Sequence, residues 1–398
     1  MTLFKFPIIT TLLDTDVYKF YMQQAVFFNY KNVHVVAELK CRNNENLGIY
    51  ANILRTQVDM LSELKLTQKE YKYMSSFSFF KKEYLDWLKN FRFNTQQVQI
   101  NNINDKLYIK IVGLWKEVIL WEVPLLSLIS EIVNTTRYQN IKKKIIKQYI
   151  KNKIFLFLNT SKNLDLSNLK IVDFGTRRRF SYEFHIFTIK LLKKYVPWFS
   201  GSSNLHISRL LNLPCVGTQS HEWFQAHQQI STNLKDSQKM ALNVWLKQYG
   251  KFLNIALTDC ITTDVFLKDF SYYYANAYKG VRHDSGDPIQ WGNKIIHHYK
   301  LLNINPKKKI LVFSDSLNFK RVLFLYNYFN HAINLVFGIG TYLTCDIPDV
   351  RPLNIVIKLI ECNSKPVAKI SDNPKKTFCL NKDFIRTLCK EFNFSIKK

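Results

Sequence analysis

From Lys170 onward the sequence alternates between short apolar runs and longer stretches with helical spacing. The helical stretches cover residues 181–195, 237–249 and 317–329. This alternation predicts parallel strands joined by right-handed crossover helices, arranged as an open doubly wound sheet or a closed barrel. In either arrangement a ligand binds beyond the carboxyl ends of the strands. The runs expected as strands are 170–173, 213–216, 255–257, 280–281, 310–313 and 335–337.

The first third of the chain has a different pattern. We expect a helix over residues 14–30, opened by an aspartate cap, and helical pieces over 61–90. Alternating residues predict strands at 33–41, 98–103 and 107–112, and a Lys-rich helical segment follows at 124–157. Strand-like alternation returns at 353–370 around Asn363 and Ser364, which indicates a hairpin. If this hairpin pairs with the N-terminal strands, the first domain is discontinuous.

Composition excludes several classes of protein. The chain has 57 Lys+Arg against 30 Asp+Glu, but the lysines are scattered along it, which is typical of solvated faces rather than of a nucleic-acid site. No segment reaches the roughly 18 uninterrupted apolar residues of a membrane span, since the best one, 114–133, contains four charged residues. The N-terminus does not read as a secretory signal. Seven cysteines without a C-x-x-C pair indicate reduced thiols in a cytoplasmic protein.

Glycine is rare, and its placement is therefore informative. Only 11 glycines occur, and most of them lie in short polar segments that follow probable strands. One such segment runs from Asp173 to Arg179 and holds three consecutive arginines, which suit bidentate recognition of carboxylate or phosphate, beside Phe174, whose flat face suits a planar ring. The segment from Gly201 to Asn204 opens a helix, either as an anion site or as a plain N-cap.

Further strand ends carry polar groups of the same kind. His221 follows the run 213–216, where it is a nucleophile, a general base or a structural histidine. The metalloprotease pattern fails because His227 lies six positions on. Arg282 stands beside two carboxylates, Asp284 and Asp287, which suit a metal-bound diphosphate or ribose hydroxyls. Segments 314–316 and 337–341 offer backbone N–H groups to phosphate, without a Walker or dinucleotide fingerprint. Together they predict a ligand with several phosphates beside a planar acid.

These segments closely resemble the nicotinate phosphoribosyltransferase family. The matching stretches are LDTDVYK, DFGTRRRFS, GTQSHEWFQAHQ, ALTDCITTDVFLKDF, VRHDSGDP, LVFSDS, FGIGTYLTCDIP, PLNIVIKLIECN and KPVAKISD, spread over nearly the whole chain. The resemblance implies an α/β fold with an irregular (β/α) barrel as catalytic domain, residues 126–349. It also implies an N-terminal α/β domain, residues 1–125, completed by C-terminal strands from about 350 to 398.

The resemblance also implies an activity. Nicotinate and 5-phosphoribosyl 1-diphosphate would give nicotinate mononucleotide in NAD salvage, with ATP as co-substrate and Mg²⁺ accompanying the diphosphate. His221 would be phosphorylated transiently. No tightly bound organic cofactor, metal-ligand set, nucleic acid or membrane is implied, and the family suggests a cytoplasmic homodimer with a shared active site. The alternatives are another barrel enzyme that acts on phosphorylated sugars or quinolinate without ATP, and a basic nucleic-acid-binding module.

The family motifs assign roles to individual residues. Nicotinate would lie between Phe174 and a Tyr18 contributed across the dimer interface, with its carboxylate near Arg282 and Thr218. Asp284 would bind the ribose, with Asp287 also in contact with substrate. Arg282, Asp284 and His221 would be the catalytic residues. Tyr342 stands where the family often has an arginine. The phosphates would be gathered by Arg177, Ser203, Asp315, Gly340 and Thr341.

Overall fold

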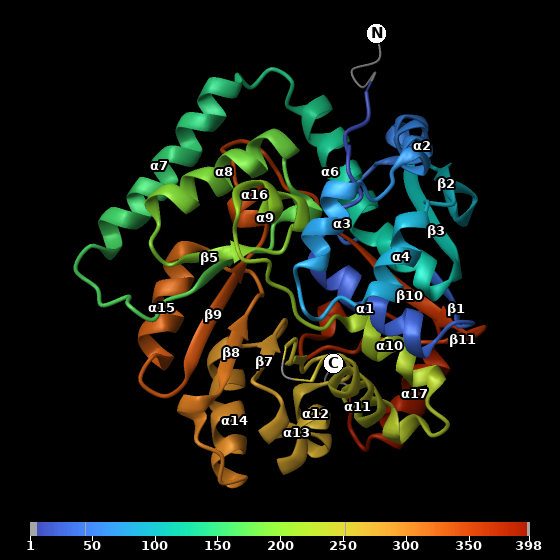
Figure 1. The fold of residues 1–398 in the computed structure, drawn as a ribbon, viewed down its shortest axis with the longest axis vertical. Helices are drawn as coiled ribbons and strands as arrows, with labels where there is room; N and C mark the ends of the chain where they lie inside the picture. Colours follow the sequence, from blue (N-terminus) through green and yellow to red (C-terminus); the bar gives the residue numbers. More distant parts are fainter. Residues whose placement is uncertain (1–5, 44, 251, 396–398) are drawn as a thin grey trace.

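Two β-sheets organise the molecule (Figure 1). The computed structural model describes residues 6–43, 45–250 and 252–395. One sheet is antiparallel, with the strand order β11-β10-β1-β3-β2, and the other is parallel, with the order β5-β4-β9-β8-β7-β6. The fold is therefore mixed α/β, as the sequence predicts.

The antiparallel sheet joins the two ends of the chain. Its central strand β1 (His34–Cys41) pairs with β3 (Lys106–Leu114) on one side and with β10 (Ile355–Cys362) on the other. Figure 1 shows β10, from the C-terminal part of the chain, beside the N-terminal β1. The outer strands are β2 (Val98–Ile103) and β11 (Lys365–Pro366).

Two tight turns give this sheet its hairpins. Asn104 and Asp105 connect β2 to β3, and Asn363 and Ser364 connect β10 to β11, and all four residues have positive φ angles. Two residues with positive φ form the hairpin turn whose twist matches that of the strands, and Asn and Asp tolerate it best. The C-terminal hairpin forms where the sequence predicts it and pairs with the N-terminal strand.

The parallel sheet corrects one sequence expectation. The predicted strand at 213–216 is reduced to an isolated bridge between Cys215 and Ser202, because Pro214 has no N–H to donate to a ladder. The edge strand next to β4 is instead β5 (Phe199–Ser202), which was not expected because its Ser-Gly-Ser run lacks an apolar signal. The other strands are β4 (Ile171–Asp173), β6 (Ile255–Leu257), β7 (Gly280–His283), β8 (Ile310–Phe313) and β9 (Asn334–Ile339).

The parallel sheet curves into an irregular barrel. No ladder joins its edge strands β5 and β6 within the described residues. The segment 214–219 spans the gap: Val216 N–H donates to Ser202 O at 3.0 Å, and Leu257 N–H on β6 donates to Gln219 Oε1 at 3.4 Å. A side chain thus replaces part of the backbone ladder, which makes the barrel irregular.

Helices cover both sheets (Figure 1). The expected segment 124–157 is two helices, α6 (Glu122–Arg137) and α7 (Lys143–Ser161), with a break at residues 138–142. The run Trp115–Arg137 is long and apolar enough to cross a membrane, but 89% of its most apolar window is buried inside the protein, as expected of a core helix. The helices are α1 (Val17–Asn29), α2 (Ala51–Met60), α3 (Gln68–Ser75), α4 (Lys82–Asn90), α5 (Trp115–Val118), α6 (Glu122–Arg137), α7 (Lys143–Ser161), α8 (Tyr182–Tyr195), α9 (Leu205–Leu211), α10 (His221–Ile230), α11 (Ser237–Tyr249), α12 (Thr263–Asp269), α13 (Tyr272–Ala277), α14 (Pro288–Leu301), α15 (Phe319–Phe329), α16 (Thr341–Thr344) and α17 (Lys382–Glu391).

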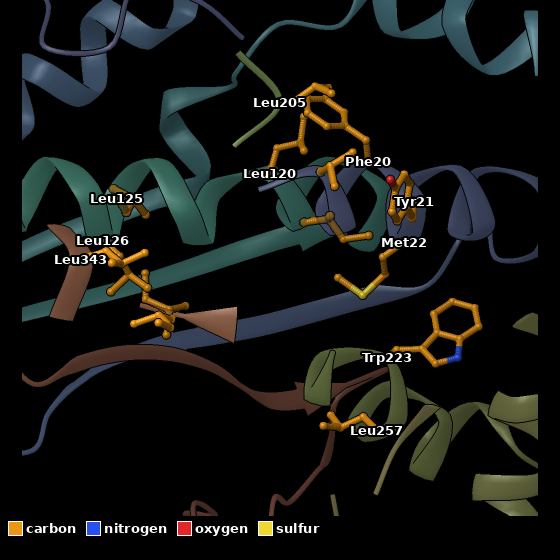
Figure 2. Close-up of a cluster of buried hydrophobic side chains, with 14 of the residues drawn as sticks. Phe20, Tyr21, Met22, Leu120, Leu125, Leu126, Leu205, Trp223, Leu257 and Leu343 are labelled. Atoms are coloured by element: carbon orange, nitrogen blue, oxygen red, sulfur yellow. The ribbon is translucent and has the colours of Figure 1, made fainter. Parts of the chain in front are cut away.

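Helix α1 is buried in the core. Phe20, Tyr21 and Met22 of α1 are each at most 1% exposed and belong to one buried cluster with Leu126 of α6 and Trp223 of α10 (Figure 2). The chain at the start of α1 docks on the β5–α9 loop, where Val17 N–H donates to Ser203 O at 2.7 Å and Leu205 N–H donates to Thr15 O at 3.0 Å. This docking places the start of α1 at the mouth of the barrel.

Candidate active site

The carboxyl ends of the parallel strands meet at one mouth. Because the strands pair in parallel register, the residues that follow them lie on the same edge of the sheet. A pocket opens there between the barrel and the inner face of the antiparallel sheet. Its polar lining includes Tyr18, Glu122, Arg177, Gln219, Ser220, His221, Glu222, Arg282, Asp284 and Lys358, and its apolar lining is Ala37, Ile111, Val118, Ile357 and Leu359.

His221 is the first residue of α10 and is 4% exposed. Its Nε2 lies 2.8 Å from Asp259 Oδ1 and 3.8 Å from Asp284 Oδ2. Burial, together with the Lys369 ammonium, lowers the pKa of His221 to about 3. The neutral ring therefore places its proton on Nε2, facing the Asp259 carboxylate. Nδ1 keeps a free lone pair and has no hydrogen-bond partner among the described residues, which is the state of a nucleophile.

Asp259 links His221 to the C-terminal part of the chain. It is fully buried and is the second residue after the end of β6. Its Oδ2 accepts a hydrogen bond from Ser285 Oγ and lies 3.3 Å from Lys369 Nζ. Burial opposes ionisation of Asp259, but Lys369 and His221 outweigh it and hold the pKa of this carboxyl well below its usual range. Both carboxylate oxygens thus already have partners.

The three consecutive arginines divide between the pocket and the core. Arg177 lines the pocket with a 36% exposed side chain, and its guanidinium lies 3.6 Å from a Glu122 carboxylate oxygen. Arg178 donates from Nε and Nη2 to Ile355 O at 3.1 and 3.0 Å. Arg179 is fully buried and binds Asp14 through two hydrogen bonds of 2.7 and 2.8 Å. Arg177 is thus the arginine of this cluster that faces the pocket, and Arg179 is structural.

Arg282 and Asp284 stand at the end of β7. Arg282 lines the pocket, and its buried Nε has no hydrogen-bond partner within the described residues. Buried polar groups are nearly always paired, so this N–H indicates an acceptor supplied by a ligand or by water. Asp284 accepts a hydrogen bond from Ser314 Oγ at 2.9 Å. Burial opposes its ionisation, but the Arg282 guanidinium holds its pKa far below the usual range, so it is a carboxylate.

The other expected phosphate contacts lie around the same mouth. Ser203 Oγ donates to Asp16 Oδ1 at 2.7 Å. Asp315 follows β8 and binds Lys376 Nζ at 2.5 Å, and this lysine also donates to Asp284 O at 3.0 Å. Gly340 and Thr341 stand at the junction of β9 and α16.

Phe174 rests on the backbone of the neighbouring strand. An ideal Cβ built at Gly338 of β9 would lie 2.3 Å from the Phe174 ring, and one built at Gly340 would lie 3.3 Å from Phe174 O. Gly338 of β9 therefore lets the ring lie directly against the sheet, and Gly340, just after β9, leaves room for the Phe174 carbonyl.

Three further expected residues, Tyr18, Thr218 and Asp287, have partners within the chain itself. Tyr18 lines the pocket of its own chain, where its hydroxyl lies 3.3 Å from Glu122 Oε2, so its presence in this pocket needs no second subunit. Thr218 is buried and donates to the adjacent carbonyl of Gln219 at 3.2 Å. Asp287 is exposed and caps α14 by accepting from Gln290 N–H at 2.8 Å. Asp287 thus has a structural role in the free chain, outside the pocket lining.

Sequence reasoning missed several charged residues of the site. Asp259, Lys358 and Lys369 all lie in segments that match the family, but no role was expected for them. Lys358 had a local signal, because it interrupts the apolar run of β10 (VIKLI) and lines the pocket. Lys369 is 2% exposed and had no signal that separates it from the many solvated lysines. Lys19 was also missed; it is fully buried, and its Nζ lies 2.5 Å from Glu222 and contacts Glu122.

One cluster at the mouth has the composition of a cation site. Ligand atoms of His221, Asp259 and Asp284 lie within 4.8 Å of one another. These residues do not fit a resident divalent cation, since the ammonium of Lys369 and the protonated Nε2 of His221 already occupy the oxygens of Asp259. Positive charge at this cluster is supplied by the protein itself.

Family models match nearly the whole chain. Residues 13–130 match the nicotinate phosphoribosyltransferase N-terminal domain, and residues 169–396 match the nicotinate phosphoribosyltransferase family. Among curated proteins, the nicotinate phosphoribosyltransferase of Buchnera aphidicola subsp. Schizaphis graminum is 59% identical, with 100% of both chains covered. The enzyme of the same name from Erwinia tasmaniensis is 54% identical, covering 99% of this chain and 98% of its own.

Solved structures agree with these matches. The crystal structure of nicotinate phosphoribosyltransferase from Vibrio cholerae superposes with a TM-score of 0.95 at 38% identity, covering 99% of this chain and 96% of that one. The structure of nicotinate phosphoribosyltransferase from Porphyromonas gingivalis gives a TM-score of 0.90 at 31% identity, covering 97% and 100%.

Proposed function

Because this chain belongs to the nicotinate phosphoribosyltransferase family, we propose that it forms nicotinate mononucleotide and diphosphate from nicotinate and 5-phosphoribosyl 1-diphosphate. The product feeds NAD salvage. The observation that carries the proposal is the pocket at the strand ends. It is lined both by the Asp284 carboxylate and by Arg282, whose Nε has no hydrogen-bond partner among the described residues. A guanidinium suits the carboxylate of a planar acid, and a carboxylate can accept hydrogen bonds from the hydroxyls of a sugar.

The proposed roles follow from charge and position. Phe174 and Tyr18 would flank the pyridine ring, and Arg282 would bind the nicotinate carboxylate. Cleavage at the anomeric carbon builds positive charge on the sugar ring, which the Asp284 carboxylate would stabilise. The departing diphosphate gains negative charge at the same time, so preorganised cations are needed opposite Asp284. Arg177 supplies such a cation in the pocket. Ser203, Asp315, Gly340 and Thr341 would complete the phosphate site, with Thr218 and Asp287 at its margin.

ATP is the second part of the proposal. The γ-phosphoryl group of ATP would pass to Nδ1 of His221, with loss of the bond to the β-phosphate oxygen and release of ADP. The proton on Nε2 would stay with the ring and keep its hydrogen bond to Asp259, which supports Nδ1 as the attacking atom. Water would later hydrolyse the phosphohistidine to inorganic phosphate. We propose that this hydrolysis pulls the reaction toward the mononucleotide.

We propose that Mg²⁺ enters with ATP and with the phosphoribosyl diphosphate, bound to their phosphate oxygens. The occupied oxygens of Asp259 support a metal that arrives with the substrates rather than one resident on the protein. No tightly bound organic cofactor is part of the proposal, and the enzyme is proposed to work in the cytoplasm.

A homodimer is the proposed assembly. Its support is the family to which the chain belongs. Light scattering should then give about twice the 47.2 kDa mass of the chain. A mass of 47.2 kDa under assay conditions would contradict the proposal.

The experiment that tests the function measures product formation by the full chain. Nicotinate should give its mononucleotide, ATP should raise the yield, and nicotinamide and quinolinate should be poor substrates. Arg282→Ala should lower kcat/KM for nicotinate by about 30-fold or more, because leaving a buried partner unpaired costs about 2–5 kcal/mol. Arg321→Ala, an exposed arginine on α15, is the matched control. A loss under threefold in Arg282→Ala would show that this residue is not part of the site. Turnover of quinolinate without ATP would contradict the proposed reaction and favour a quinolinate-using enzyme.

A further inference from the structure

Residues 367–371 run past the site as a clamped segment. Gln228 of α10 holds it on one side, donating from Nε2 to Ala368 O at 2.8 Å and accepting from Ala368 N–H at 2.8 Å. On the other side, Ile370 N–H donates to Cys260 O at 2.8 Å, next to Asp259. Lys369 lies between these two anchor points, so its backbone is fixed relative to both α10 and the β6–α12 loop.

The Lys369 side chain points into the site and is 3% exposed. Its Nζ lies 3.3 Å from Asp259 Oδ2 and 3.2 Å from Ser371 Oγ. Ser371 Oγ lies 2.8 Å from Ser285 Oγ, which itself donates to Asp259. The ammonium therefore faces one oxygen of Asp259 while His221 Nε2 faces the other.

From this geometry we propose that Lys369 is a positioning residue that keeps His221 neutral and oriented for phosphorylation by balancing the charge of Asp259. The inference deepens the proposed function and rests on it for the identity of the phosphoryl donor. A carboxylate alone at 2.8 Å would draw a second proton onto the imidazole and occupy the attacking nitrogen. With Lys369 on its other oxygen, Asp259 still accepts from Nε2 but no longer favours the imidazolium.

The charges around His221 support this assignment. Asp259 and Asp284 face the ring with negative charge, and Lys369 and Lys358 act on it with positive charge. Burial opposes protonation, and Lys369 is the charged group that lowers the pKa of His221 most. Removing its charge leaves two carboxylates near a buried imidazole with one lysine opposing them. Protonation of His221 then moves toward neutral pH.

The direct test follows the titration of His221 by NMR in full-length protein carrying ¹³C-labelled histidine, with the signal assigned by its loss in His221→Gln. In the wild-type protein this signal should not titrate between pH 5 and 8. In Lys369→Met it should titrate within that range, and in Lys369→Arg it should behave as in the wild-type protein. Lys375→Met is the matched control, because this exposed lysine lies in the same C-terminal segment. If Lys369→Met does not fold, Lys369→Gln serves, since its amide keeps the hydrogen bond without the charge.

The kinetic readout is the pH dependence of phosphate transfer from ATP. Lys369→Met should lose at least tenfold in rate at pH 6 and much less at pH 8.5, with little change in KM for ATP. An equal loss at all pH values, together with an unshifted His221 signal, would show that Lys369 acts only in folding and overturn the inference. If the NMR shift appears but even wild-type protein takes up no phosphate, the proposed function fails while the role of Lys369 in setting the state of His221 stands.

Discussion

At the scale of single residues, the role of a charged side chain depends on the groups that it contacts in the folded structure. Arg177 and Arg179 are two positions apart in the same cluster, yet one lines the pocket and the other is buried against Asp14. Sequence reasoning recognised the cluster but could not divide it, because the partner lies 165 positions away. It found His221 and Arg282 through motif context. It could not find Lys369, whose function depends on the distant Asp259.

Lys358 gives a prediction about pH. Burial lowers the pKa of this pocket lysine to about 8, so it is charged below that pH and neutral above it. Nicotinate remains an anion throughout this range, and its KM should therefore rise as the pH passes through about 8. Lys358→Met should weaken nicotinate binding at pH 7 by roughly three- to tenfold and abolish the pH dependence, which corresponds to about 0.7–1.4 kcal/mol.

Steady-state assays between pH 6.5 and 9.5 provide the check. Lys358→Arg should keep tight binding across the whole range, since a guanidinium stays charged. Lys365→Met, an exposed lysine on the adjacent β11, should behave like the wild-type enzyme. A KM for nicotinate that stays constant across pH 8 in the wild-type enzyme would contradict the role given to Lys358.

At the scale of elements, local pattern predicted most strands and helices but not their exceptions. Strong alternation placed β1, β3 and β10, and apolar runs placed β4, β8 and β9. β5 was missed because its Phe-Ser-Gly-Ser sequence has no apolar signal, and its place in the sheet comes from pairing with β4. The false strand at 213–216 has an apolar signal, but its proline limits pairing.

The contact between β9 and the β4 loop gives a prediction at this scale. Gly338→Ala places a methyl group 2.3 Å from the Phe174 ring, so the ring must leave its position. We expect the KM for nicotinate to rise about tenfold or more and the stability to fall by about 1–3 kcal/mol, the usual cost of overpacking.

A double-mutant cycle separates the two effects. In Gly338→Ala combined with Phe174→Ala the clash is gone, so thermal stability should recover relative to Gly338→Ala, while nicotinate affinity should stay low. Unchanged nicotinate binding in Gly338→Ala would show that the position of Phe174 does not matter for this substrate.

At the scale of the whole molecule, the site exists because distant parts of the chain converge. Tyr18 comes from α1, His221 from α10 and Lys358 from β10, which is hydrogen-bonded to β1 near the other end of the sequence. The hairpin at the C-terminus was predictable from its alternation. The clamping of residues 367–371 beside the barrel was not, because it depends on side-chain contacts such as that of Gln228 with Ala368.

The central claim is that this convergence makes His221 the acceptor of a phosphoryl group in a nicotinate phosphoribosyltransferase reaction. The most direct measurement incubates full-length protein with γ-labelled ATP, locates the phosphate by mass spectrometry at alkaline pH, and then adds nicotinate and phosphoribosyl diphosphate. Acid-labile phosphate should appear on His221, be lost in His221→Gln, persist in a His331→Gln control, and be discharged as mononucleotide forms. Phosphate on another residue, or undiminished labelling in His221→Gln, would contradict the account.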